Sequence, residues 1–96
     1  MEKNQKFIVR CQGAGVFYGE IASRKGEEAE LVNVRQLWYW SGAASLMQLA
    51  NEGVKSPRQC KFNVTVDKVI VTKVIEIIPC TEEAVKSIDA VPVWKV

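Results

Sequence analysis

The residues in this sequence that could do chemistry together lie close to one another, between positions 35 and 45. Three consecutive aromatic side chains provide ring faces, an arginine before them provides a guanidinium, and two serines after them provide hydroxyls. This combination suits a nucleotide, because a base stacks on aromatic rings and a phosphate pairs with arginine. The candidate ligand-binding residues are therefore Arg35, Trp38, Tyr39, Trp40, Ser41 and Ser45.

The aromatic block also has a second interpretation. In an extended strand, Trp38 and Trp40 would lie on one side and Leu37 and Tyr39 on the other. Two tryptophans on one face of a strand more often belong to a protein core or to a subunit interface than to a ligand pocket. The block therefore predicts a pocket, a core segment or an interface.

Catalytic chemistry has little support in the residue types present. Histidine is absent, which removes the usual general base and the usual zinc ligand. Gly13 and Gly15 lack the third glycine and the strand-to-helix context of a dinucleotide fingerprint, so they favour a hairpin turn. We therefore expect a protein that is not an enzyme and that uses no cofactor and no metal.

The cysteines and the overall charge indicate which cellular compartment and which kinds of binding partner to expect. Cys11, Cys60 and Cys80 are widely spaced and form no Cys-x-x-Cys pair, so we expect free, partly buried thiols in a reducing cytoplasm. The formal net charge of +2 is too small to predict binding to DNA or to a membrane surface. No apolar run is long enough to span a bilayer, and residues 1–10 lack the apolar core of a secretory signal peptide.

The elements that must position the aromatic block are mainly strands. Apolar, β-prone segments at 7–11, 16–22 and 28–34 are separated by glycine-containing turns, and 35–40 is predicted as a further extended segment. Segments 60–66 and 69–78 follow, separated by Asp67-Lys68, and form either a hairpin or one long bent strand.

Two short helices complete the predicted elements. Ser45 with Gln48 three residues later matches a capping box for a helix over 46–52, and Gly53 is placed to end it. Thr81 is the predicted N-cap of the second helix.

The whole chain predicts one α+β domain. At 96 residues, 48% apolar and 25% charged, it suits a single hydrophobic core. The expected fold is a small β-rich meander of five to six mainly antiparallel strands with two short helices. We expect residues 1–5 to be flexible and the apolar tail at 91–96 to pack on the body or on a neighbouring subunit.

Several stretches together resemble a known family. These are residues 9–19, 35–46, 75–81 and 91–94, and the block Leu-Trp-Tyr-Trp-x-Gly-Ala-x-Ser-Leu at 37–46 is specific among them. The pattern resembles a family of small uncharacterised proteins encoded by tailed bacteriophages and prophages. The resemblance implies a phage origin and a cytoplasmic setting in an infected bacterium, and it implies no activity or catalytic residue.

The functional expectation combines the block with this resemblance. We expect a phage-encoded, non-enzymatic binding protein, a homo-oligomer that sequesters a nucleotide-derived signalling molecule of antiphage defence at its subunit interfaces. The alternative is a structural or protein-interaction module, either a virion accessory or an inhibitor of a host protein. A nucleic-acid-binding regulator is a third expectation.

Overall fold

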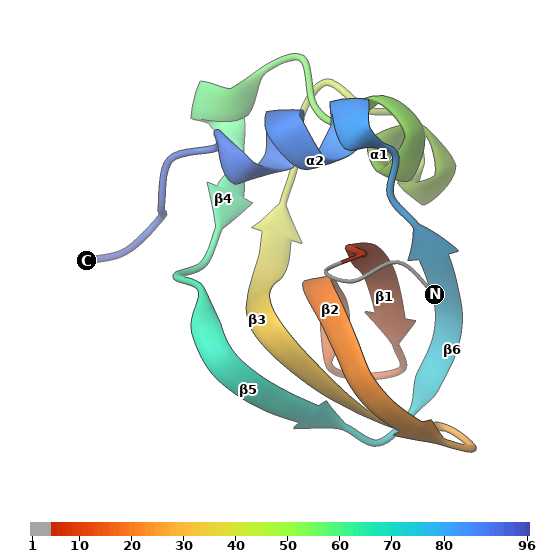
Figure 1. Ribbon diagram of the computed structural model, residues 1–96. Helices are drawn as coiled ribbons and strands as arrows, with labels where there is room; N and C mark the ends of the chain where they lie inside the picture. Colours follow the sequence, from red (N-terminus) through yellow and green to blue (C-terminus); the bar gives the residue numbers. More distant parts are fainter. Residues whose placement is uncertain (1–4) are drawn as a thin grey trace.

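Residues 5–96 of the computed structural model, the part of the chain that the structure describes, form a six-stranded sheet and two α-helices (Figure 1). The chain order is β1 (Phe7–Cys11), β2 (Gly15–Lys25), β3 (Glu28–Tyr39), α1 (Leu46–Glu52), the 3₁₀ turn η1 (Pro57–Gln59), β4 (Lys61–Phe62), β5 (Val66–Val71), β6 (Val74–Pro79) and α2 (Glu82–Asp89). This confirms the predicted small, β-rich α+β fold. The expected flexible segment 1–5 lies outside the described residues except for Gln5, whose side chain donates to the Cys80 carbonyl at 3.0 Å.

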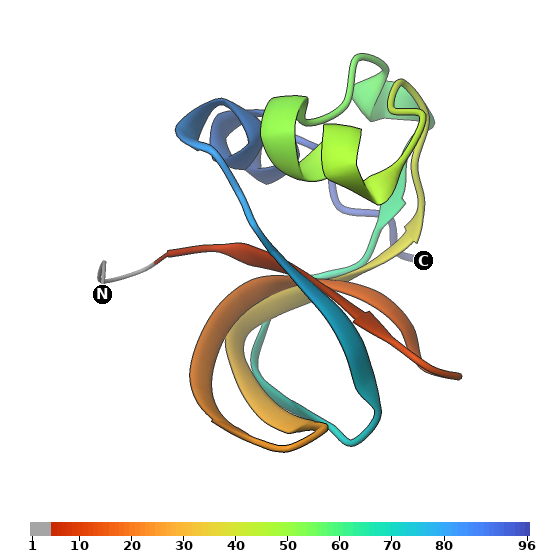
Figure 2. The ribbon, with the colours of Figure 1, turned by 90° about the vertical axis from the view of Figure 1, so that its right-hand side faces the viewer.

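The sheet is antiparallel throughout and strongly curled. Its order is β4-β3-β2-β1-β6, and β5 pairs with the first half of β3 while β4 pairs with the end of β3. Strands β5 and β6 thus lie at opposite edges, yet only Thr72 and Lys73 connect them. Because the three residue steps from Val71 to Val74 span at most about 11 Å, the two edges must converge there, and the sheet closes into the curl seen in Figures 1 and 2.

Three strand predictions are corrected by this topology. The segments predicted at 28–34 and 35–40 form the single strand β3. Asp67 and Lys68 lie inside β5, where Lys68 pairs with Val32, and the break falls at Thr72 instead. The predicted segments 60–66 and 69–78 form neither a hairpin nor one strand: they are divided among β4, β5 and β6, of which β5 pairs with β3 and β6 pairs with β1.

Two hydrophobic clusters lie on either side of β1. Ile8 faces the helices with Tyr18, Leu49 and Ile88, whereas Val9 faces the inside of the curl with Leu31, Val34 and other buried side chains. Ile8 and Val9 are adjacent and both fully buried, so β1 is covered on both faces. Burial of each such side chain contributes about 1.5–3 kcal/mol.

The helix ends follow the predicted capping. The Ser45 hydroxyl accepts from the Gln48 amide at 3.2 Å, and the Thr81 hydroxyl accepts from the Ala84 amide at 3.1 Å. Gly53 ends α1 with a φ of 79°, a conformation that favours glycine. The Thr81 hydroxyl also donates to the Asn51 carbonyl at 2.7 Å, so the N-cap of α2 is tied to α1.

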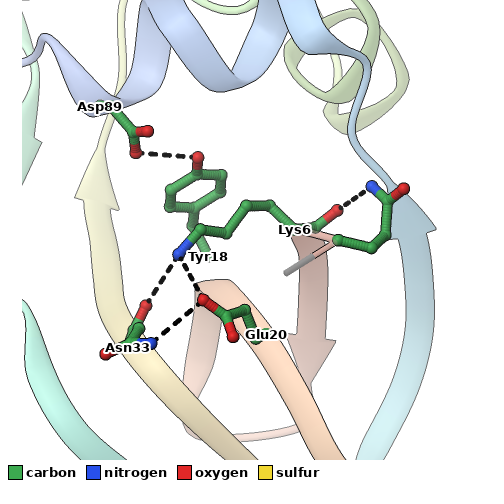
Figure 3. A network of polar contacts seen from close by, with 6 residues as sticks. Lys6, Tyr18, Glu20, Asn33 and Asp89 are labelled. Atoms are coloured by element: carbon green, nitrogen blue, oxygen red, sulfur yellow. Dashed lines mark hydrogen bonds and ion pairs between the residues drawn. The ribbon is translucent and has the colours of Figure 1, made fainter. Parts of the chain in front are cut away.

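Polar contacts join Lys6, just before β1, to β2 and β3, and join β2 to α2 (Figure 3). Lys6 pairs with Glu20 at 3.2 Å, and the Asn33 amide donates to the same Glu20 oxygen at 3.1 Å. The Asn33 amide and then the Lys6 ammonium lower the pKa of Glu20. The Tyr18 hydroxyl donates to Asp89 of α2 at 2.9 Å, and burial followed by this bond raises the pKa of Tyr18.

Candidate functional site

The aromatic block lies where β3 ends, at an irregular pairing with β4. Leu37 pairs with Phe62 and Tyr39 with Lys61, so Trp38 is an extra residue in β3. Such a bulge breaks the alternation of side chains. Trp38 is 62% exposed and Tyr39 51% exposed, while Leu37 is buried.

The aromatic block does not form a regular two-sided strand. The prediction that Trp38 and Trp40 share one side of a strand is not met, because β3 ends at Tyr39. Trp40 is half-buried and packs against the helix-side cluster, whereas Trp38 faces solvent. The three rings nevertheless line one surface hollow of about 290 Å³. The aromatic block is therefore anchored by Trp40, and it leaves the side chains of Trp38 and Tyr39 exposed to solvent.

Arg35 does not belong to this surface. It is 6% exposed, and its guanidinium donates to four backbone carbonyls, of Asn63 at 3.0 Å, Phe62 at 3.2 Å, Val91 at 3.3 Å and Ile88 at 3.4 Å. Burial lowers the pKa of Arg35, and Asp89 opposes that shift. The predicted pairing of Arg35 with a ligand phosphate is corrected: this side chain joins β3 to the end of β4, to α2 and to the start of the tail.

The two predicted serines serve local structure. Ser45 is the N-cap of α1. The Ser41 hydroxyl donates to the Gln59 side chain at 3.4 Å, and the Ser41 amide donates to the Cys60 sulfur at 3.4 Å. Ser41 therefore fastens the end of the aromatic block to η1, and neither hydroxyl is free to define a ligand pocket alone.

The structure adds Lys61 and Trp94 to the site. Lys61 lies opposite Tyr39 in the β3–β4 pair, and its ammonium lies 5.6 Å from the ring centroid of Trp94. The Trp94 amide donates to the Phe62 carbonyl at 2.9 Å, which places the tail beside β4. No local pattern in the sequence indicates this contact, because it depends on how strands distant in sequence pair.

The tail contributes a second hollow beside β4. Trp94 is 45% exposed. A hollow of about 330 Å³ is lined by Asn63, Val64, Trp94, Lys95 and Val96. We call Trp38, Tyr39, Lys61, Trp94 and Lys95 the aromatic–basic surface. Its rings come from β3 and the tail, with Lys61 of β4 between them.

The segments that build this surface carry no acidic side chain. Residues 31–51, 53–66 and 90–96 contain no Asp or Glu, while Lys55, Arg58, Lys61 and Lys95 lie within the last two of them. Within residues 5–96 the ion pairs are Lys6–Glu20, Arg10–Glu76 and Lys68–Glu30, so none uses a cation of this surface. The charge here favours an anionic ligand.

The other reactive groups are buried. Cys11, Cys60 and Cys80 are free and buried, as expected of unpaired thiols. Burial, followed by the Asp89 charge, raises the pKa of Cys80 to about 12, so its thiol is protonated near neutral pH. In the described part of the chain, His, Cys, Asp and Glu form no group of three that could hold a metal ion.

Comparison with known proteins and protein families gives one match, to a family model. Neither α-helix, of seven and eight residues, is long enough to cross a membrane, and residues 5–96 contain no other candidate helix. No curated protein and no solved structure matches the chain significantly. A family model for a domain of unknown function, DUF6948, matches residues 4–88, a range that includes the aromatic block and Lys61 but stops before Trp94. Because this match covers most of the chain, the chain belongs to the DUF6948 family.

Proposed function

We propose that this chain is a phage-encoded, non-enzymatic binding protein that sequesters a nucleotide-derived signalling molecule at interfaces between its own copies. The observation that carries the proposal is the aromatic–basic surface, where exposed rings and lysines occur together on segments that contain no acidic residue. Stacking on an aromatic side chain is worth about 1–3 kcal/mol per base. A lysine beside such a ring adds attraction for phosphate.

The roles of the residues follow from their positions. Trp38 and Tyr39 are the stacking residues, because both are more than half exposed and line the same hollow. Lys61 takes the part first assigned to Arg35, since it lies opposite Tyr39 in the β3–β4 pair. Trp40 holds the aromatic block in place, because it packs against the hydrophobic cluster that faces the two helices.

An assembly of several copies would complete the site. Trp38 and Tyr39 are 62% and 51% exposed, so one chain covers only part of each ring. Ligand pockets usually enclose most of the ligand surface. A second copy would supply the missing wall and would cover the exposed side chain of Val93.

The test is native mass spectrometry of the purified protein, alone and after incubation with cyclic di- and trinucleotides and ADP-ribose derivatives. We expect a discrete oligomer that retains one compound, and we expect Trp38→Ala and Lys61→Ala to lose it while keeping the oligomer mass. Lys73→Ala is the matched control, because Lys73 is exposed in the β5–β6 turn at the far end of the sheet (Figure 1). Retention of no compound by any oligomer would reject the proposal.

A protein-interaction module, either a virion accessory or an inhibitor of a host protein, is the second candidate. It is favoured by the exposed apolar side chains of Val64, Val93 and Val96 around Trp94, since apolar exposure of this kind is typical of protein-binding surfaces. A host protein that co-purifies with the wild type and is lost with Trp94→Ala, without any response to nucleotides, would support it.

A further inference from the structure

The aromatic–basic surface has two aromatic hollows, one on each side of a lysine. The first is lined by Trp38, Tyr39 and Trp40, and the second contains Trp94. Lys61 lies opposite Tyr39 in the strand pair and 5.6 Å from the Trp94 ring centroid. One cation therefore lies between two places where a planar ring can stack.

The spacing of these two places is set by the strands. Tyr39 is on β3, Lys61 is on β4, and the tail lies beside β4 through the bond from the Trp94 amide to the Phe62 carbonyl. Val93 pairs with Phe62 of β4, so β4 lies between β3 and the tail, and two strand spacings of about 4.8 Å put the backbones of β3 and the tail about 10 Å apart. That separation exceeds the step of about 3.4 Å between stacked bases, which favours two bases that are not stacked on each other.

We infer that this surface binds a ligand with two nucleobases joined through phosphate, with one base at Trp38–Tyr39, the other at Trp94, and the linking phosphate at Lys61. The inference rests on the proposed function and narrows its ligand class. A mononucleotide would occupy one hollow only and leave the other ring in water. Lys61 is exposed, so its ammonium can turn from the Trp94 ring to the phosphate. Lys95, which lines the second hollow, adds a second cation.

The experiment compares ligands of one and two bases on the same protein. Affinities for AMP, linear ApA and cyclic di-AMP, and for the corresponding guanosine compounds, are measured by isothermal titration calorimetry. We expect at least one two-base compound to bind about tenfold or more tightly than its mononucleotide. Trp94→Ala should reduce the two-base affinity to the mononucleotide value, whereas Trp94→Phe should restore most of the difference.

The outcomes separate this inference from the proposed function. Equal affinity for one-base and two-base compounds, unaffected by Trp94→Ala, would overturn the inference and leave nucleotide binding intact. Absence of binding by every compound would overturn both. Affinity that keeps rising with the length of single-stranded oligonucleotides, with a steep salt dependence, would overturn the inference in favour of strand binding. Urea unfolding of Trp94→Ala checks that the variant is folded.

Discussion

Replacing Arg35 with methionine removes the only buried charged side chain among residues 5–96. Four backbone carbonyls, two beside β4, one in α2 and one in the tail, lose their donor. Each such bond contributes about 1 kcal/mol, and the apolar surface of methionine offsets about 1 kcal/mol of the total. We expect Arg35→Met to lower the free energy of unfolding by about 3 kcal/mol.

Urea unfolding followed by tryptophan fluorescence measures this loss, and thermal unfolding should show a decrease in Tm of about 12–24 °C. Arg58→Met is the matched control, because Arg58 is exposed in η1 and should stay within about 0.5 kcal/mol of the wild type. Arg35→Lys keeps the charge but lacks the planar fork that reaches several carbonyls, so it should be intermediate.

Two results would refute this reasoning about Arg35. The first is an Arg35→Met protein as stable as the Arg58→Met control, which would mean that the four carbonyls do not depend on the guanidinium. The second is an Arg35→Lys protein that is fully folded yet has lost nucleotide affinity. That result would return Arg35 to the ligand-binding role predicted from the sequence.

Three further perturbations test the packing and the buried titrating groups. Gly19→Ala places a Cβ 2.8 Å from the Val34 Cβ and should cost about 1–3 kcal/mol in urea unfolding; unchanged stability would show that β2 and β3 can separate. Tyr18→Phe removes the 2.9 Å bond to Asp89 and should cost about 1 kcal/mol by calorimetry, so a stabilised variant would contradict the role of that bond. The pKa of Cys80 rises from 9.0 to about 12 on folding, so the folded state keeps the thiol proton to a higher pH than the unfolded state does. The stability that this difference contributes is complete below pH 9 and is lost as the pH rises towards 12. The decline of unfolding free energy over that range should be shallower in Cys80→Ala, and identical slopes would argue against burial of this thiol.

Short-range signals account for the features that the sequence predicts well. The N-caps at Ser45 and Thr81 and the end of α1 at Gly53 depend on residues within four positions of one another. The β-propensity of 7–11 and the turn at Gly13 and Gly15 likewise act within the β1–β2 hairpin. Each of these interactions forms between residues that are near in sequence, so the local residue types suffice to predict it.

Long-range pairing explains the features that the sequence does not predict. Asp67 and Lys68 have turn propensity, yet they continue β5 because Val66 and Lys68, on either side of Asp67, pair with β3. The extra residue at Trp38 arises from the register with β4, and this bulge decides which ring faces solvent. Lys61 and Trp94 are distant in sequence and meet only because the tail lies beside β4.

The sequence by itself determined the fold class, the helix caps, the absence of histidine chemistry and the presence of an aromatic block, because these depend on composition and on near neighbours. The tertiary structure decided what each member of that block does. In the folded chain, Arg35 is buried and donates hydrogen bonds to four backbone carbonyls, whereas Trp38 and Tyr39 are exposed. Buried carbonyl groups need hydrogen-bond donors, and a guanidinium can supply several of them. Only the folded chain brings the ends of β4 and α2 and the start of the tail around position 35, so the sequence alone does not reveal this role.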